Sequence, residues 1–369
     1  MNKKIGILTH WSIPNFGSFL QAYALQKVLQ EMFPQDDVRQ IAYMNKVHAK
    51  MYYGFEMHEI YRLWIINPHF YKDVLRRIMS SKSIKEIRRF SKFYLEFIPH
   101  TEQYNERNIQ KTNFDTIVLG SDILWDYSIP FYDHDKYVFG INLNAERIIS
   151  YAASFGTVKP DQNHPQYVLD GIRRLDAISV RDSNSAMISE NITGYKAKLV
   201  LDPTMLWNFN TDENIELPDI DYKYIVVYGS FFDDDQIAFV KHYCKQNNLK
   251  IVYLDSVGDR CDWCDVFIEA STINPFQWCG YIKNSEYLMT CTFHGLMFGL
   301  IFHKRILFNA TQFMRDKSTE FINYLGLSDV LLSNEGFDKK IDYDWDYKTI
   351  NDLIEIRRRQ SLEFLTENK

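Results

Sequence analysis

The sequence lacks any long apolar run, since in 369 residues none approaches the roughly 20 apolar residues that a membrane-spanning helix needs. It also lacks an excess of positive charge, because 42 lysines and arginines stand against 48 aspartates and glutamates. The net charge of −6 argues against a general nucleic-acid binder, so we expect no nucleic-acid partner. The N-terminus reaches Pro14 and Asn15 before any long apolar core, which predicts a first strand instead of a signal peptide. We therefore expect a cytoplasmic protein, at most peripheral at the inner face of a membrane.

Cysteine is scarce, and its five residues, an odd number in a chain without an export signal, predict reduced thiols. Cys261 and Cys264 have the spacing of zinc ligands, but the sequence offers no second pair at a suitable distance. The aspartate clusters at 133–135 and 342–346 match a DxD metal pattern and also match solvated acidic turns, which we favour. The sequence thus predicts no metal site.

Short apolar strands alternate with helical patterns along the whole chain. The apolar runs are continuous, which suits strands of parallel sheets that are covered on both faces. Strands are expected in KKIGILTH, DVRQIAYM, FDTIVLGSD, RIISYAASFG, DAISVRD, AKLVLDPT, YIVVYGS, KIVYLDS, EYLMTCTFHG and RILFNA. This alternation predicts βαβ units and an α/β fold.

A chain of this length exceeds one comfortable core, so we expect two Rossmann-like domains. The first covers 1–207 and contains an aromatic, basic, mostly helical insertion at 46–110. The second covers 208–345 and begins after the turn-rich WNFNTDENIELPDID. The segment 346–369 predicts a last helix that packs back on the first domain.

The insertion concentrates positive charge, with 11 lysines and arginines against 4 acidic residues from Lys46 to Lys92, a net +7. Aromatic side chains are interleaved with these basic ones. Two interpretations remain open. The segment is either a solvated helical face with a buried aromatic side, or a surface that rests on an anionic membrane through 46–92.

Polar residues gather at the ends of predicted strands, where ligands bind in open α/β sheets. After the first strand, Asn15, Gly17 and Ser18 precede the helix that holds Gln21. Gly17 permits close backbone approach, and Ser18 caps the helix or binds an oxyanion. The alternative is a simple capped helix start.

Two further strand ends carry candidates. Ser121 and Asp122 follow FDTIVL, where a turn-and-cap role is the alternative. Arg181 ends AISV, and a guanidinium at this place can bind phosphate or carboxylate in a bidentate manner. An ion pair with Asp182 or another neighbour would be the structural explanation of the same residue.

His294 lies at the end of a buried strand, where it is either a structural ring or a proton-transfer group. Gly295 follows it and removes steric cover at the start of a helix, so we expect an anion to fit there. A ring that titrates near neutrality can donate and accept a proton, which favours the catalytic interpretation.

Six blocks follow one another between residues 4 and 310: IGILTHWSIPNFGSFLQAYALQKVL, FDTIVLGSDILW, ISYAASFG, ISVRDSNS, VLDPTMLW and TCTFHGLMFGLIFHKRI. In this order they resemble the bacterial polysaccharide pyruvyl transferase family. The resemblance implies a GT-B-like fold, in which two Rossmann-like domains face each other across a cleft. It further implies phosphoenolpyruvate as donor, a sugar of a surface-polysaccharide precursor, typically a lipid-linked oligosaccharide, as acceptor, and a cyclic pyruvate ketal as product. Neither a cofactor nor a metal is implied.

The resemblance assigns roles to individual residues. Arg181 matches the donor-binding arginine of the VRD block, and His294 matches the active-site histidine of the FHG block. Thr292 stands where some members carry an arginine, so one cationic contact to the donor is missing here or comes from elsewhere. Together with Gly295 these residues form the expected donor site on the second domain's side.

The acceptor site is expected on the first domain. There Asp122, which we group with His294 and Arg181 as catalytic, would orient sugar hydroxyls. The other expected acceptor-binding residues are Asn15, Gly17, Ser18, Gln21 and Ser121. Two other functions remain open, a nucleotide-sugar glycosyltransferase of the same fold and a non-catalytic carbohydrate-binding protein. The lack of a clear ribose- or base-reading signature weighs against the first of them.

Overall fold

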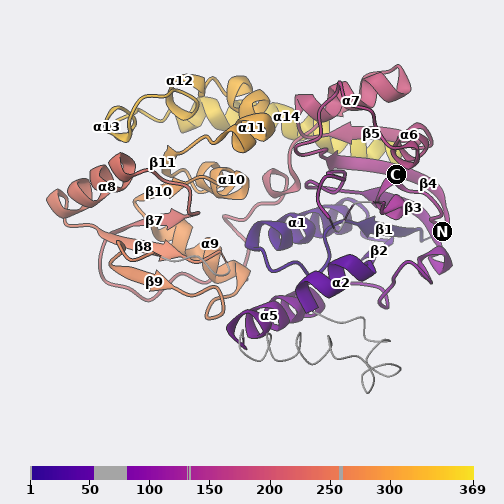
Figure 1. The fold of residues 1–369 in the computed structure, drawn as a ribbon, viewed down its shortest axis with the longest axis horizontal. Coiled ribbons are helices and arrows are strands. Elements are labelled where there is room, and N and C mark those ends of the chain that lie inside the picture. The colour runs from indigo at the N-terminus through magenta and orange to yellow at the C-terminus, as the bar shows by residue number, and fades with distance from the viewer. Residues whose placement is uncertain (1, 54–80, 131, 133, 257–260) are drawn as a thin grey trace. The chain divides into compact units, whose positions relative to one another are not determined.

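The computed structural model divides the chain into two compact units, which are described separately (Figure 1). Unit 1 comprises Met1–Val200 and Phe364–Lys369, and unit 2 comprises Leu201–Glu363. The structure describes residues 2–53, 81–130, 132, 134–256 and 261–369.

Unit 1 is built on a parallel sheet of six strands in the order β2-β1-β3-β4-β5-β6. The strand order reverses between β1 and β3, so the carboxyl ends of these two strands form a topological switch point, the usual ligand site of such sheets. The hydrophobic residues of β1 are buried, and so are those of β3 apart from the half-buried Phe114, as expected for strands covered by helices on both faces. The strands are β1 Lys4–Leu8, β2 Asp37–Gln40, β3 Phe114–Leu119, β4 Ala145–Ala153, β5 Ala177–Val180 and β6 Lys198–Leu199.

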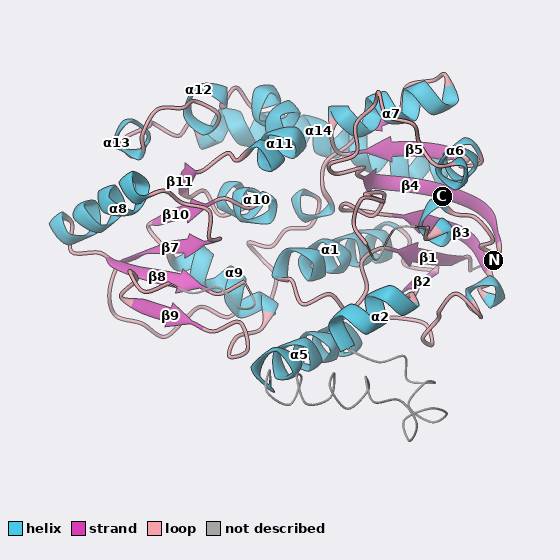
Figure 2. Ribbon diagram, in the orientation of Figure 1, coloured by secondary structure: helices cyan, strands magenta, loops and turns pink. Residues whose placement is uncertain are grey.

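Helices flank the strands of unit 1 (Figure 2). Helix α1 starts where Asn15 Oδ1 accepts a hydrogen bond from Ser18 N at 3.0 Å, which satisfies one of the unpaired amides of a helix start. Trp125 lies in the core with its ring 5.1 Å from that of Phe155 and 6.1 Å from that of Phe139. The helices are α1 Phe16–Met32, α2 Lys46–Tyr53, α5 Ser81–Phe97, α6 Gln166–Arg173 and α7 Ser183–Thr193, with short 3₁₀ turns η1 Ile109–Lys111 and η2 Lys136–Phe139.

Unit 2 contains a parallel sheet of five strands in the order β11-β10-β7-β8-β9. Its order reverses between β7 and β10, which gives this unit a switch point of its own. The strands are β7 Tyr224–Tyr228, β8 Lys250–Leu254, β9 Val266–Ile268, β10 Tyr287–Thr290 and β11 Arg305–Phe308. The helical elements are η3 Pro203–Met205, α8 Asp234–Gln246, α9 Pro275–Asn284, α10 Phe293–Ile301, α11 Gln312–Tyr324, α12 Ser328–Leu331, α13 Phe337–Lys340 and α14 Tyr347–Asn368.

The ten predicted strands are all present, although the strand expected in AKLVLDPT is only the two residues of β6. The sequence analysis missed β9, whose three half-buried residues are too few to give a period. The units divide after Val200, whereas the predicted boundary followed residue 207. The 3₁₀ turn η3, which lies between Leu201 and residue 207, packs against α10 of unit 2, a tertiary contact that no local pattern predicts.

The last helix, α14, ends within unit 1 (Figure 1). There the Phe364 ring lies 6.5 Å from that of Tyr151, Arg147 Nη2 donates to Asn368 Oδ1 at 2.9 Å, and Lys369 pairs with Asp36. In the predicted insertion, α2 and α5 are described, whereas residues 54–80 lie outside the described part. None of the helices that the structure describes combines the length and apolarity needed to cross a membrane.

Candidate functional site

At the switch point of unit 1, side chains from three elements surround the carboxylate of Asp122. Asp122, just after β3, accepts a hydrogen bond from Arg181 Nη2 at 2.8 Å and from Ser18 Oγ at 3.3 Å. His10 Nε2, just after β1, lies 3.6 Å from the second carboxylate oxygen. All four side chains are buried, so Arg181 and Asp122 form an ion pair shielded from water. Arg181 therefore pairs with Asp122 and not with Asp182, whose carboxylate caps α7.

A second set of hydrogen bonds lies beneath this cluster. Ser121 Oγ donates to Gln21 Oε1 at 2.6 Å, Gln21 Nε2 donates to Thr9 Oγ1 at 3.1 Å, and Thr9 Oγ1 donates to the Ser121 carbonyl at 3.1 Å. Gln21 and Ser121 are 0% exposed. They support the loop of Asp122, whereas we expected them to contact an acceptor. The reason is that their polar groups satisfy one another inside the fold, which burial requires.

The helix start after β1 also differs in detail from the expectation. Asn15 caps α1, so the hydroxyl of Ser18 is not the cap and turns instead to Asp122. Asn15 is exposed, and Gly17 is buried within the first turn of α1. Ser18 is thus the residue of this stretch that contacts the carboxylate.

The backbone fixes the direction of the Asp122 side chain. Asp122 has φ 68°, in the left-handed region that costs a non-glycine residue about 1–3 kcal/mol and persists where the surroundings impose it. Its carbonyl accepts from Ser154 N at 2.8 Å. Gly120 has φ 117°, and a Cβ there would lie 2.3 Å from the Tyr151 carbonyl oxygen. The turn GSD therefore aims the carboxylate at Arg181.

Sequence reasoning missed two residues of this cluster, His10 and Tyr132. The Tyr132 hydroxyl hydrogen-bonds to His10 Nδ1, and the two rings lie 5.2 Å apart. His10 ends the strand ILTH, so the rule that selected Asp122 and Arg181 could have selected it. Tyr132 lies in a loop, and no signal in the sequence announces its contact with His10.

Two more titratable groups are buried in unit 1. Burial, aided by His10, lowers the pKa of His48 to about 3. Burial raises the pKa of Asp135 to about 6, against hydrogen bonds from Asn45 Nδ2 at 2.6 Å and the Tyr43 hydroxyl at 2.9 Å. The expectation of a solvated acidic turn at 133–135 is therefore wrong for Asp135, because these donors draw it into the interior.

These two groups predict opposite pH dependences of stability. His48 ordinarily titrates at 6.5, so its contribution is complete above pH 6.5 and is lost as the pH falls toward 3, about 2 kcal/mol by pH 5. Asp135 ordinarily titrates at 3.8, so its contribution is complete below that pH and is lost as the pH rises through 6. We expect His48→Gln to weaken the loss of stability on acidification and Asp135→Asn to steepen it. Urea unfolding between pH 5 and 7.5 measures both slopes, and equal slopes in the two variants would contradict the assignment.

In unit 2, His294 is the second residue of α10, at the carboxyl end of β10 and beside the switch point. Thr292 caps the helix, because its Oγ1 accepts from Gly295 N at 3.0 Å. Thr290 Oγ1 donates to the Tyr228 carbonyl of β7 at 2.8 Å and accepts from Thr292 N at 3.2 Å. The histidine is thus carried on a turn that is tied to both strands of the switch point.

The structure gives a reason for glycine at position 295 that the sequence analysis did not consider. Its amide is engaged by Thr292, and a Cβ at this position would lie 2.2 Å from Thr290 Oγ1 and 2.6 Å from Thr292 Oγ1. The close packing of the cap by itself requires glycine here.

Replacing Gly295 by alanine is therefore expected to destabilise unit 2 by about 1–3 kcal/mol through overpacking. The added methyl would displace the two threonine hydroxyls and shift the turn that carries His294. Chemical denaturation measures the cost. Gly326→Ala is the control, because a Cβ there meets open space and any cost comes from its positive φ of 71° and not from overpacking. An unchanged stability of Gly295→Ala would show that the cap tolerates a side chain.

A carboxylate that the sequence analysis did not single out faces His294. Asp202 Oδ2 lies 3.9 Å from His294 Nε2, with 1% of the aspartate side chain and 11% of the histidine side chain exposed. Asp202 belongs to the VLDPT block, directly before η3. An imidazole beside a buried carboxylate can take up and return a proton, as a general acid–base group must.

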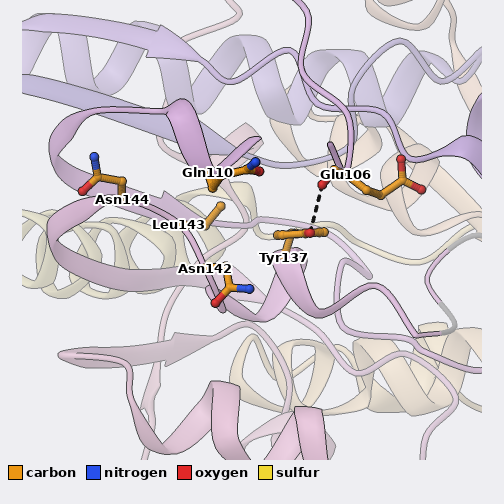
Figure 3. Close-up of a pocket in the computed structure, with 6 residues that line it drawn as sticks. All are labelled: Glu106, Gln110, Tyr137, Asn142, Leu143 and Asn144. Atoms are coloured by element: carbon orange, nitrogen blue, oxygen red, sulfur yellow. Dashed lines mark hydrogen bonds between the residues drawn. The ribbon is translucent and has the colours of Figure 1, made fainter. Parts of the chain in front are cut away.

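The structure also has a surface pocket, but it lies at the wrong edge for this chemistry. A cavity of about 530 Å³ in unit 1 is lined by Glu106, Gln110, Tyr137, Asn142, Leu143 and Asn144 (Figure 3). Asn142 to Asn144 precede β4, so the cavity opens at the amino ends of the strands, opposite to Asp122. The Tyr137 hydroxyl donates to the Glu106 carbonyl at 3.0 Å across it.

The part of the chain that the structure describes contains no group of three or more metal-ligating side chains. Burial raises the pKa of Cys261 to about 12, which disfavours the thiolate that zinc needs. Asp342, Asp344 and Asp346 are exposed, as expected for a solvated turn.

The model of one protein family, described as polysaccharide pyruvyl transferase, matches residues 15–308. The match includes the Asn15 helix cap, the Asp122 and Arg181 strand ends and the turn of His294. The chain belongs to this family. Its members are transferases that act in polysaccharide pyruvylation, so the resemblance noted in the sequence is confirmed. No curated protein sequence matches the chain.

Solved structures are similar to the fold at low sequence identity. The UDP-GlcNAc 2-epimerase from Methanocaldococcus jannaschii has a TM-score of 0.51 and 11% identity, over 96% of this chain and 92% of that one. The S. aureus MnaA-UDP co-structure has a TM-score of 0.49 at 12% identity, covering 97% and 90%. The E. coli heptosyltransferase WaaC with ADP has 0.39 at 9%, covering 84% and 89%. The epimerase match and the two parallel sheets confirm two Rossmann-like domains.

Proposed function

We propose that this member of the family transfers the pyruvyl group of phosphoenolpyruvate to a sugar of a lipid-linked polysaccharide precursor, forming a cyclic ketal and releasing phosphate. One observation carries the proposal. The two motif blocks that hold Arg181 and His294 end strands of two separate Rossmann-like sheets, and each sheet has polar, titratable groups at its switch point.

The reaction requires a proton to reach the methylene carbon of the donor while a first sugar hydroxyl bonds to the neighbouring carbon and loses its own proton. A second hydroxyl then bonds to that carbon, loses its proton and displaces phosphate, which closes the ketal ring. We assign the delivery of the first proton to His294, because such transfer needs a group that both donates and accepts. No cofactor or metal enters these steps.

The donor carries a carboxylate and a phosphate, so it needs a fixed cation. We assign this contact to Arg181, whose guanidinium is held in place by Asp122 and presents N–H donors in a rigid fork. Asp122, with Ser18 beside it, is the group that we assign to the acceptor hydroxyls. Thr292 has its hydroxyl in the helix cap, so its contribution to the donor site is to hold the His294 turn.

The test combines the purified protein, phosphoenolpyruvate and candidate lipid-linked oligosaccharides, with and without EDTA. We expect phosphate release that depends on the acceptor and persists in EDTA, together with a mass gain of one pyruvate ketal on the oligosaccharide. Saturable binding of a nucleoside diphosphate without this mass gain would instead indicate a glycosyltransferase. Sugar binding without turnover would indicate a carbohydrate-binding protein.

We also propose that the basic segment 46–92 contacts the anionic membrane where such acceptors are anchored. The described end of α5 supports an electrostatic contact, because Arg88 and Lys92 are exposed. Its aromatic side is used within unit 1, where Phe90 lies 4.9 Å from Phe16 and Tyr94 5.2 Å from Phe19 (ring centroids). Flotation with anionic liposomes should therefore weaken with salt and on replacing the lysines and arginines by glutamine. Unchanged flotation in that variant would end the proposal.

A further inference from the structure

The VLDPT block belongs to the family pattern, but no step of the proposed reaction uses its residues. It lies directly after β6, and its aspartate, Asp202, is among the most buried carboxylates of unit 2. Asp202 Oδ1 accepts from Thr204 N at 3.1 Å and Thr204 Oγ1 at 2.8 Å, which caps η3. Its other oxygen, Oδ2, faces His294 Nε2 at 3.9 Å. A capping aspartate needs one oxygen, and the second one is directed at the imidazole.

The loop of Asp202 is clamped by α14 within the same unit. Ser361 Oγ accepts from Leu201 N at 3.0 Å, one residue before the aspartate. Arg358 donates through Nε and Nη2 to the Leu206 carbonyl at 3.2 and 3.0 Å, just after η3. Both ends of the turn are therefore fixed, and a side chain held in this way can position another group within a fraction of an ångström.

His294 presents one nitrogen to this carboxylate. Its Nε2 is buried, although 11% of the side chain remains exposed. A carboxylate on the Nε2 side favours the proton at that nitrogen in the neutral ring and stabilises the ring when both nitrogens carry protons.

Charged side chains also lie on the other described elements that pack on α10. Within α10, the neighbours of His294 are Phe293, whose ring meets it edge to face at 5.3 Å, and Gly295. The charged side chains of the remaining neighbours have partners of their own: Lys283 donates to the Asn210 carbonyl, Arg305 to the Tyr287 hydroxyl and Arg315 to the Ala310 carbonyl, Asp316 accepts from Gln312, Glu320 pairs with Arg357, and Lys317 lies over Phe313.

We propose that Asp202 is the positioning residue of His294: its carboxylate, 3.9 Å from Nε2, favours the proton at that nitrogen and supports the imidazolium form. The proposal rests on the proposed function for the reaction in which His294 takes part. The assignment of tautomer and charge support concerns the folded protein alone.

The test is an NMR titration of His294, identified by the signals that disappear in His294→Asn. In the wild type the neutral ring should be protonated at Nε2. In Asp202→Asn the pKa of His294 should fall by about one unit or more, since an opposite charge at this distance is lost. Asp212→Asn is the matched control, because Asp212 accepts from Trp207 Nε1 in the following loop, and it should leave the titration unchanged.

The outcomes distinguish failure of this proposal from failure of the proposed function. A neutral wild-type ring protonated at Nδ1 overturns the proposal and needs no variant that might unfold. An unaltered pKa in folded Asp202→Asn overturns it as well. If the wild type forms no ketal from phosphoenolpyruvate but the titration shifts as expected, the proposed function fails while the pairing stands. If ketal is formed, the acidic limb of kcat against pH should move by the same amount in Asp202→Asn.

Discussion

Replacing His294 by asparagine is expected to slow ketal formation by about 10²- to 10⁴-fold, equivalent to roughly 3–5 kcal/mol of activation free energy. Asparagine keeps a polar side chain at the second position of α10 but cannot titrate, so the variant loses proton transfer and little else. The fold should persist, because the helix cap depends on Thr292 and not on the imidazole. Acceptor-dependent phosphate release and product mass measure the effect.

His303→Asn is the control for this experiment. His303 lies just after the same helix, is exposed and shares a hydrogen bond with Asn351. Its replacement should leave the rate unchanged. Full activity in His294→Asn would remove His294 from the mechanism, whereas equal losses in both variants would point to a general effect on the fold.

Arg181→Met is expected to destabilise unit 1 by about 3–5 kcal/mol, because it leaves the buried carboxylate of Asp122 without its counter-charge. The double variant Arg181→Met/Asp122→Asn removes both charges and should be more stable than Arg181→Met alone. Hydrogen exchange of the β1 and β3 amides, combined with urea unfolding, assigns the change to unit 1.

The pair Arg39–Asp37 offers a matched comparison within the same unit. Its N–O distance is also 2.8 Å, but its side chains are 50% and 47% exposed, so Arg39→Met should cost no more than about 1 kcal/mol. Equal costs at the two arginines would contradict the view that burial makes the Arg181 pair important. An additive double variant would show that Arg181 and Asp122 do not interact in solution.

Much of the fold could be predicted, because each sheet is built from continuous apolar runs separated by helical patterns. The strands β1, β3, β7 and β10 are evident in the sequence for this reason. β6 and β9 were shortened or missed, because two or three residues carry no period. The division after Val200 depends on packing against α10, which a boundary drawn from turn residues cannot see.

The candidate sites could likewise be predicted only in part. The rule that ligands bind at the carboxyl ends of strands selected Asp122, Arg181 and His294, and it could have selected His10. It did not reveal that Gln21 and Ser121 bond to each other out of reach of solvent, nor that Gly295 makes room for two threonine hydroxyls. These outcomes depend on distances of a few ångströms between residues far apart in the sequence.

The sequence by itself determined the class of the fold, the family and the strand ends at which chemistry is to be sought, because apolar periodicity and short motifs are local properties. Only the tertiary structure decided which groups meet there. It paired Arg181 with Asp122, added His10 and Tyr132 beside them, and set Asp202 against His294. Buried polar groups must find partners, and the strand order, which is not a local property, decides which partners are within reach.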